Sequence, residues 1–213
     1  ARTMTSLSVS AHAKLTLNLF VGPPRPPKGY HPIRSWFVAV DLHDTVRVER
    51  LGDGEASRVE IAWAADAPRP TPIDWPVEKD LAARAHALLE RSVGRALPVR
   101  LRVEKRIPVG GGLGGGSSDA AATLMAVNRL FGLGLGRERL AELSTSLGSD
   151  VAFFIDDHTP PRPAVVGGFG EQIERGGRVA GEGVLFFPPF GCPTAAVYQA
   201  FDRDAGHDPS DPA

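Results

Sequence analysis

The sequence predicts an α+β fold. Long gaps separate the segments that have strand character, and only a few of these gaps contain a helical pattern. A doubly wound parallel sheet would instead alternate strands and helices along the whole chain. No internal repeat is visible.

The first third of the chain carries most of the predicted strands. Residues 7–21 form a long apolar segment in which Lys14 lies among leucines, and residues 35–42, 45–50 and 59–63 have the same character. A proline-rich turn at residues 22–28 follows the first segment. A loop with four prolines at residues 66–76 follows the last.

The middle of the chain carries the clearest helices. Apolar residues at positions 81, 82, 85, 88 and 89 form one face of a helix over residues 81–92. Val99, Leu101 and Val103 alternate as in a half-buried strand. Residues 120–131 are rich in good helix formers, and a second helix over residues 137–147 ends at Gly148.

The last third of the chain is predicted to form shorter strands and helices. We expect a short apolar strand at residues 151–155, strands around residues 164–166 and 184–187, and a helix over residues 194–201. The proline-rich segment 156–163 predicts a boundary between a domain at residues 1–157 and an incomplete one at residues 158–213. The tail at residues 202–213 is expected to be disordered.

Composition narrows the class of protein. The net charge of −1 gives no electrostatic support for a nucleic-acid partner, and no apolar run approaches the roughly 20 residues that span a bilayer. No signal peptide is visible, and the single cysteine, Cys192, fits a cytoplasmic protein. Because only four of the 24 basic residues are lysines, Lys14 inside an apolar segment needs an explanation.

The strongest motif is a glycine loop. Six of the seven residues from 110 to 116 are glycine, and they follow a predicted strand and enter a helix that we expect to begin near Ser117. Glycine lets a ligand approach the backbone closely, and the start of a helix suits a phosphate. Ser117 or Ser118 is expected to cap the helix or to offer a hydroxyl to Mg²⁺.

Three other interpretations of the loop fit its sequence less well. A flexible linker rarely joins a strand directly to a strong helix. The dinucleotide-binding fingerprint needs an acidic residue about 20 positions further on, and residues 128–135 contain none. A Walker A loop needs a lysine and then Ser or Thr after its last glycine, but Ser117 follows Gly116 directly.

Residues 108–121, Pro-Val-Gly-Gly-Gly-Leu-Gly-Gly-Gly-Ser-Ser-Asp-Ala-Ala, resemble the ATP-binding motif of the GHMP kinases (galactose, homoserine, mevalonate and phosphomevalonate kinases). Three more segments resemble one branch of that superfamily, whose substrate is a cytidine diphosphate-linked methylerythritol. They are Ala-Lys-Leu-Thr-Leu-Asn-Leu at 13–19, Gly29-Tyr30-His31 followed by Asp-Leu-His-Asp-Thr at 41–45, and Leu-Gly-Ser-Asp-Val-Ala-Phe-Phe at 147–154. The resemblance runs from about Leu7 to about Phe201.

The resemblance implies a two-domain architecture. The N-terminal domain would be similar to domain 2 of ribosomal protein S5, and a ferredoxin-like C-terminal domain would begin after it. Family members carry a second glycine-rich motif, and nothing after Cys192 resembles it. We therefore expect the second domain to be incomplete in this chain.

The resemblance also implies a reaction, the transfer of phosphate from Mg-ATP to the 2-hydroxyl of the substrate. Asp150 would be the general base, and Lys14 would hold the hydroxyl and the γ-phosphate in register. Taken alone, Asp150 is more often a cap or a surface-turn residue, and Lys14 an edge-strand residue, than a catalytic group. Together with the glycine loop, the catalytic interpretation of both residues is favoured.

Binding residues follow from the same resemblance. Tyr30 and His31 would recognise the cytosine, although a lone histidine after Gly-Tyr is often an ordinary turn residue, and Asn18 and Tyr198 complete the expected substrate site. The remaining histidines form no ligand-spaced cluster, so we expect no metal besides Mg²⁺. The expected ATP contacts are Lys105, Pro108, Gly110, Gly111, Gly112, Leu113, Gly114, Gly115, Gly116, Ser117, Ser118 and Asp119.

Two alternatives to this function stay open. One is a GHMP kinase for another small alcohol, which the pair Tyr30-His31 argues against. The other is a nucleotide-binding pseudoenzyme or inactive fragment that binds ATP without turnover. The sequence carries no signal for the oligomeric state.

Overall fold

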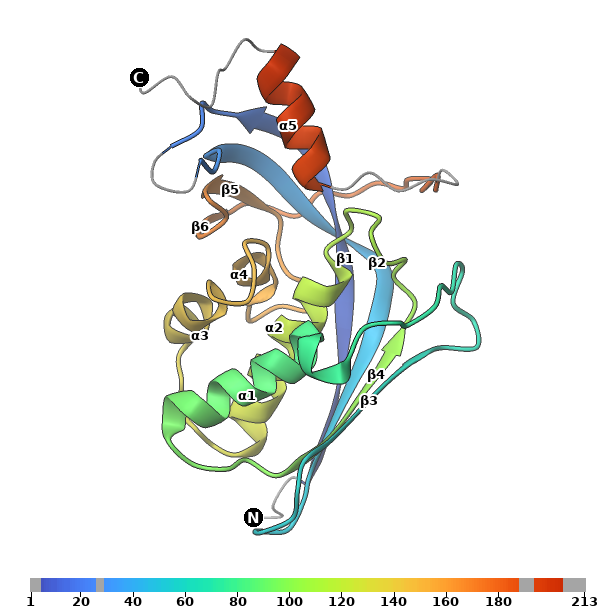
Figure 1. The fold of residues 1–213 in the computed structure, drawn as a ribbon, viewed down its shortest axis with the longest axis vertical. Helices are drawn as coiled ribbons and strands as arrows, with labels where there is room; N and C mark the ends of the chain where they lie inside the picture. The colour runs from blue at the N-terminus through green and yellow to red at the C-terminus, as the bar shows by residue number, and fades with distance from the viewer. Residues whose placement is uncertain (1–4, 26–28, 188–193, 205–213) are drawn as a thin grey trace.

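The computed structural model describes residues 5–25, 29–187 and 194–204. Its centre is a six-stranded sheet covered on one face by the helices α1 to α4 (Figure 1). The predicted α+β class is confirmed. Among the described residues, no helix is long and apolar enough to span a bilayer.

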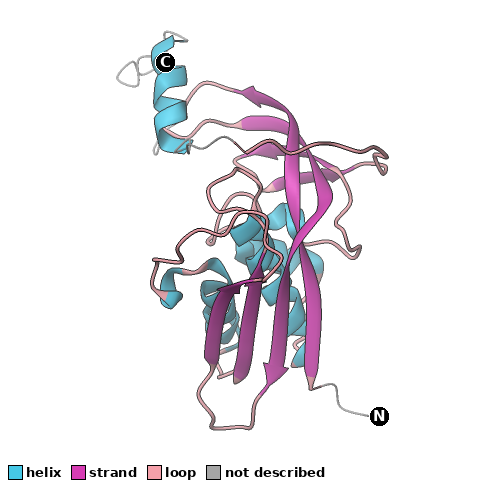
Figure 2. Ribbon diagram, turned by 90° about the vertical axis from the view of Figure 1, so that its right-hand side faces the viewer, coloured by secondary structure: helices cyan, strands magenta, loops and turns pink. Residues whose placement is uncertain are grey.

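Two long antiparallel strands organise the sheet: β1 (Ser6–Val21) and β2 (Ile33–Arg50). One edge of β2 pairs with β1. Its other edge pairs with β4 (Val99–Lys105) near one end and with β5 (Ala164–Gly168) near the other (Figure 2). The outer strands are β3 (Arg58–Trp63), parallel to β4, and β6 (Gln172–Arg175), antiparallel to β5.

The β1–β2 pair is irregular on both sides of Lys14. The register shifts between His12 and Lys14 and again between Thr16 and Asn18. Such bulges redirect side chains and free backbone groups from the ladder. Here the Lys14 N–H donates to the carbonyl of Leu113, at 2.9 Å, and so connects the strand to the glycine loop.

The helices bury one face of the sheet. Valines and leucines of β2 and β4 pack against α1 (Leu81–Val93) and against α2 (Gly115–Leu130), whose ten buried residues include four alanines. Small side chains let α2 approach the sheet closely. The remaining helices are the 3₁₀ turn η1 (Val77–Lys79), α3 (Arg137–Ser144), α4 (Val151–Phe154) and α5 (Thr194–Asp204).

Most predicted elements are confirmed. The α1 helix begins after Asp80, whose side chain accepts the N–H of Ala82 at 2.8 Å, and ends at Gly94 with φ +66°. The two strands predicted at 35–42 and 45–50 are one strand, because β1 pairs with both and bridges the residues between them. The β6 strand was not predicted, since a single apolar residue, Ile173, marks it.

Three predictions are wrong. Residues 151–155 were expected to form a strand, but Val151–Phe154 is a helical turn with all four side chains buried. An apolar run this short fits either structure, and packing decides. Residues 184–187 form no strand; Val184 is 97% exposed and has no neighbouring strand among the described residues. Asp202–Asp204 belong to α5, whereas the rest of the tail lies outside the described residues.

The segment after α4 is fixed by Asp156. Its carboxylate accepts hydrogen bonds from the Arg162 backbone and guanidinium at 2.8–3.0 Å. Arg175 of β6 lies beside it and donates to the carbonyls of Phe153 and Ile155. The cluster therefore ties α4 to the β5–β6 hairpin. The division into domains at residues 157 and 158 stays a prediction.

Asp156 is expected to make stability depend on acid pH. Burial opposes its charge, but the hydrogen bonds from Arg162 and the charge of Arg175 hold its pKa below the ordinary 3.8. Because the folded-state pKa is depressed, the stabilisation is complete above pH 3.8 and is lost as the pH falls below it. Asp156→Asn is expected to cost roughly 2 kcal/mol at pH 7 and to flatten this acid dependence. Urea unfolding from pH 7 to pH 3 measures both effects.

The control is Asp157→Asn, because the Asp157 side chain is 74% exposed and pairs only at the surface with Arg137. If both variants lose the same stability, Asp156 does not hold the junction.

Candidate active site

The glycine loop has the conformation that its sequence requires. It joins β4 to α2, and Gly110, Gly112 and Gly114 have φ of +75°, +70° and +71°. Gly114 also packs tightly, since a Cβ there would lie 2.9 Å from Phe154 Cζ and 3.1 Å from Lys14 Cγ. Leu113 is buried with Ala13 and Ile107 and anchors the loop against β1.

Helix α2 begins two residues earlier than predicted. Gly114 is its N-cap and has no side chain to cap it, so the predicted capping by Ser117 or Ser118 is wrong: both lie in the first turn. The first turn of a helix presents N–H groups that have no intrahelical acceptor. With its positive dipole end, this turn suits an anion.

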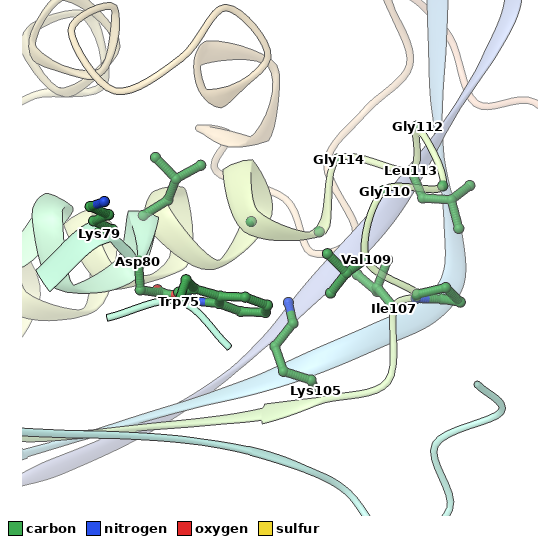
Figure 3. Close-up of a pocket in the computed structure, with 15 residues that line it drawn as sticks. Trp75, Lys79, Asp80, Lys105, Ile107, Val109, Gly110, Gly112, Leu113 and Gly114 are labelled. Atoms are coloured by element: carbon green, nitrogen blue, oxygen red, sulfur yellow. The ribbon is translucent and has the colours of Figure 1, made fainter. Parts of the chain in front are cut away.

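A pocket of about 260 Å³ opens along the loop. Figure 3 shows the Lys105 side chain pointing from the end of β4 toward the start of α2. Trp75 and Asp80 lie on the side of Lys105 that is opposite the glycine loop. The pocket lining includes nine of the predicted ATP contacts, namely Lys105, Pro108, Gly110, Gly111, Gly112, Leu113, Gly114, Gly115 and Gly116. Ser117, Ser118 and Asp119 follow within α2 and are not part of this lining.

A buried ionic cluster supports the loop at both ends. The Lys105 ammonium donates to Asp44 and, at 2.6 Å, to Asp119, the fifth residue of α2. The other oxygen of Asp44 accepts the backbone N–H groups of Arg106 and, at 2.8 Å, Ile107. The cluster therefore connects β2, the residues that precede the loop, and the helix that follows it.

The charges within this cluster are strongly coupled. Burial opposes the charge of Lys105, but the carboxylates of Asp119 and Asp44 together raise its pKa above the ordinary value. Burial raises the pKa of Asp119, an effect that Lys105 counters and Asp44 increases. Asp119 Oδ1 is buried without a hydrogen-bond partner among the described residues.

Asp44 lies in the segment 41–45, which was quoted only for its resemblance to a substrate-binding motif, and no contact with Lys105 was predicted for it. Asp44→Asn is expected to weaken ATP binding about tenfold and to lower the free energy of unfolding by roughly 2–3 kcal/mol. Asparagine keeps an oxygen for the backbone N–H groups but loses the charge that holds Lys105. Calorimetric titration with ATP and urea unfolding measure the two effects.

Asp41→Asn is the matched control, since Asp41 lies on the same strand and is exposed. An Asp44→Asn variant with reduced stability and unchanged ATP affinity would show that the cluster supports the fold alone.

The two predicted catalytic residues lie together. Lys14 Nζ is 3.5 Å from Asp150 Oδ2, and Lys14 is only 7% exposed. Asp150 holds the N-cap position of α4, but its side chain makes no capping hydrogen bond. This observation removes the capping role considered from the sequence and leaves the carboxylate facing Lys14.

Thr16 is a third residue of the group around Lys14 and Asp150, and it was not predicted from the sequence. The Lys14 ammonium donates to Thr16 Oγ1 at 3.0 Å and lies 4.4 Å from the centre of the Phe37 ring. Residues i and i+2 of a strand share a face, so this spacing was the available signal. Asn18 lies elsewhere: its side chain accepts the N–H of Trp36 at 2.7 Å and it lines neither of the two pockets described here.

A second pocket, of about 970 Å³, contains the other predicted substrate residues. Tyr30, His31 and Tyr198 line it, together with Gly148 and Ser149, which precede Asp150. The rings of His31 and Tyr198 lie 5.2 Å apart. Burial and the negative charge of Asp150 raise the pKa of Tyr198.

Metal-binding groups are sparse. In the part of the chain that the structure describes, no group of three or more His, Cys, Asp or Glu side chains could hold a metal ion. Mg²⁺ in nucleotide sites commonly keeps several waters and binds phosphates besides one or two protein oxygens. The hydroxyls of Ser117 and Ser118 stay the predicted contacts.

Comparison with known proteins gives concordant results. Residues 80–157 match the family described as GHMP kinases N terminal domain. The chain is 39% identical over 196 residues to a 4-diphosphocytidyl-2-C-methyl-D-erythritol kinase of Bordetella parapertussis, which covers 92% of this chain and 60% of that protein. It is 40% identical to the protein of that name from Methylibium petroleiphilum, covering 89% of this chain and 61% of the relative.

A solved structure agrees with these relatives. The crystal structure of a 4-(cytidine 5′-diphospho)-2C-methyl-D-erythritol kinase superimposes with a TM-score of 0.67 at 32% identity. The match covers 91% of this chain and 64% of the other. The chain thus spans about three fifths of the length of the curated relatives that it matches.

Proposed function

Because this chain has the GHMP kinase fold and carries the N-terminal domain of those kinases, we propose that it binds ATP and phosphorylates the 2-hydroxyl of 4-diphosphocytidyl-2-C-methyl-D-erythritol. This is a step of the non-mevalonate isoprenoid pathway, and we place it in the cytoplasm. The observation that carries the proposal is the position of the Lys14–Asp150 pair, which adjoins both the glycine loop and the second pocket.

The contacts of that pair support the proposal. The backbone N–H of Lys14 binds the glycine loop at Leu113, and its Cγ lies against Gly114. Asp150 follows directly after Gly148 and Ser149, which line the pocket of Tyr30 and His31. A phosphate donor in the loop and an alcohol in the second pocket would therefore meet at these two side chains.

The loop fits a nucleotide phosphate. Only glycine at position 114 lets the loop pack against Phe154 and Lys14, and the first turn of α2 presents N–H groups that suit a phosphate. When bound, Mg-ATP supplies the phosphoryl group and neutralises part of its charge. The residues that would hold it are the glycines of the loop, with Ser117 or Ser118 near the metal.

Side chains of the protein would supply the proton acceptor and the positive charge that the reaction needs. The Asp150 carboxylate would accept the proton of the substrate hydroxyl as that oxygen bonds to the γ-phosphorus of ATP. The bond from this phosphorus to the β,γ-bridging oxygen would break, and ADP would leave. The Lys14 ammonium holds the same oxygen and stabilises the negative charge that develops on the phosphoryl group. Thr16 orients Lys14 through its hydroxyl. Positioning and charge are the main demands of phosphoryl transfer, and these groups meet them.

Product formation tests the proposal. The purified chain is incubated with Mg-ATP and 4-diphosphocytidyl-2-C-methyl-D-erythritol, and the 2-phosphate is detected by mass. Parallel reactions contain mevalonate, homoserine or galactose. We expect product from the cytidine compound alone. Product from another alcohol would support the alternative kinase, and ATP binding without any product would support the pseudoenzyme or inactive fragment.

A further inference from the structure

The turn between β5 and β6 packs against the segment that carries Asp150. Gly170 of this turn is buried, and its φ is +109°. A Cβ at Gly170 would lie 2.3 Å from the Ser149 carbonyl oxygen and 2.8 Å from both the carbonyl carbon and the Cβ of Ser149. A side chain cannot occupy that space, so only glycine lets the turn lie directly against the Ser149 backbone.

The turn itself is held in place by hydrogen bonds. β5 pairs with β2 on one side and with β6 on the other. Within the turn, the Gly170 N–H donates to the Gly167 carbonyl at 3.1 Å, and the Glu171 carboxylate accepts the Phe169 N–H at 2.7 Å. A larger residue at position 170 would therefore displace its neighbour more readily than it would displace the turn.

Helix α4 is also fixed relative to this hairpin. All four of its side chains are buried. Arg175 of β6 donates to the carbonyls of Phe153 and Ile155, which ties the end of the helix to the strand that follows the turn. Because the helix and the hairpin are joined there, the part that can yield is the exposed residue Ser149, just before Asp150.

The Asp150 side chain has few contacts that would hold it independently of its backbone. It makes no capping hydrogen bond. Oδ1 lies 3.4 Å from Ser149 Oγ, Oδ2 lies 3.5 Å from Lys14 Nζ, and the side chain is 28% exposed. The Ser149 carbonyl belongs to the peptide group that joins Ser149 to Asp150. The position of that carbonyl therefore decides where the Asp150 carboxylate lies.

We propose that Gly170 is a positioning residue for Asp150: it lets the β5–β6 turn hold the Ser149–Asp150 peptide where the carboxylate faces Lys14. Phe169 and Glu171, on either side of Gly170, line the second pocket, so the same turn also borders the place proposed for the alcohol. The inference rests on the proposed function, because it takes Asp150 as the general base.

The first test is structural and needs no activity. In a crystal structure of Gly170→Ala we expect the Ser149 carbonyl to be displaced and the Lys14–Asp150 contact to lengthen from 3.5 Å to beyond about 4 Å, the limit of an ion pair. If the variant keeps the contact, the inference is wrong and the proposed function stands. If the unaltered chain forms no product, the proposed function fails, and this structure still decides whether Gly170 positions Asp150.

The second test is kinetic. Gly170→Ala is expected to lower the single-turnover rate about 10²-fold, because a small displacement of a catalytic group has effects of this size. In the Asp150→Asn background the same change is expected to lower the rate by less than about threefold, since the base is already absent. An equal loss in both backgrounds would show that Gly170 does not act through Asp150.

Gly168→Ala is the matched control. Gly168 lies at the same turn with φ +66°, so an alanine is strained there too. The atoms nearest to its Cβ belong to the side chains of Glu171 and Gln172 and not to the Ser149 backbone, and side chains can turn away. We expect lower stability in thermal unfolding, but a rate within about threefold of the unaltered chain at saturating substrate.

A second variant covers the case in which Gly170→Ala does not fold. Glu171→Ala removes the acceptor of the Phe169 N–H and so loosens the turn without adding an atom to it. At saturating substrate, its rate is expected to fall about tenfold, and again to fall little in the Asp150→Asn background. An unchanged rate in this variant would show that the turn does not position the base.

Discussion

Asp150→Asn is expected to lower the rate of product formation by about 10²- to 10⁴-fold, because asparagine keeps the shape of the side chain but cannot accept the hydroxyl proton. ATP affinity is expected to stay within about twofold, since Asp150 faces Lys14 and not the loop pocket. Single-turnover product formation and calorimetric titration with ATP measure the two quantities separately. Full activity in this variant would show that another group is the base.

Asp53→Asn is a suitable control, because this surface carboxylate is 92% exposed. Lys14→Ala extends the test. If Lys14 and Asp150 act on the same hydroxyl, the double variant loses little more activity than the more damaging single variant. Additive losses would show that the two residues act independently in spite of their 3.5 Å contact.

Gly114→Ala is expected to weaken ATP binding more than any other single alanine substitution in the loop. At φ +71° an alanine is strained, and its Cβ would lie 2.9 Å from Phe154 and 3.1 Å from Lys14. Strain of roughly 1–3 kcal/mol corresponds to about a five- to 150-fold loss if it falls on the bound conformation. Titration calorimetry measures the ATP affinity, and thermal unfolding reports any general loss of stability.

Alanine substitutions at two other loop glycines separate backbone strain from close packing as causes of weaker ATP binding. Gly112 has φ +70°, but a Cβ there meets no described atom within 4 Å, so Gly112→Ala tests backbone strain alone. Gly111 has no such φ, and its nearest contact is 3.5 Å away. We expect the effect to decrease from Gly114 to Gly112 to Gly111. If all three alanine variants lose the same ATP affinity, the close packing of Gly114 is not the cause of the loss.

Local sequence signals predicted the elements that carry the site. Helix α1 was predicted to within one residue at its C-terminus, because the apolar periodicity that predicts it lies within the helix itself. The glycine loop was recognised because a strand, six glycines and a helix follow one another without interruption. Lys14 was singled out because a lysine among leucines is unusual in a chain with so few lysines.

Contacts between distant residues could not be predicted in this way. Asp44 and Lys105 are 61 residues apart, and His31 and Asp202 are 171 residues apart. No local spacing distinguishes Asp44 from exposed Asp41, and the three residues at the end of α5 read as a polar tail. These pairs exist only because β2 runs beside β4 and α5 lies against the pocket of His31.

The sequence by itself therefore determined the fold class, the position of the glycine loop and the choice of Lys14 and Asp150 as candidate catalytic residues. The tertiary structure decided that residues 151–154 are helical, that β2 is a single strand, and which carboxylates meet Lys105 and His31. The physical reason is the range of the interactions. Propensity, capping and glycine conformation act within a few residues, whereas burial and ion pairing depend on which segments the completed sheet brings together.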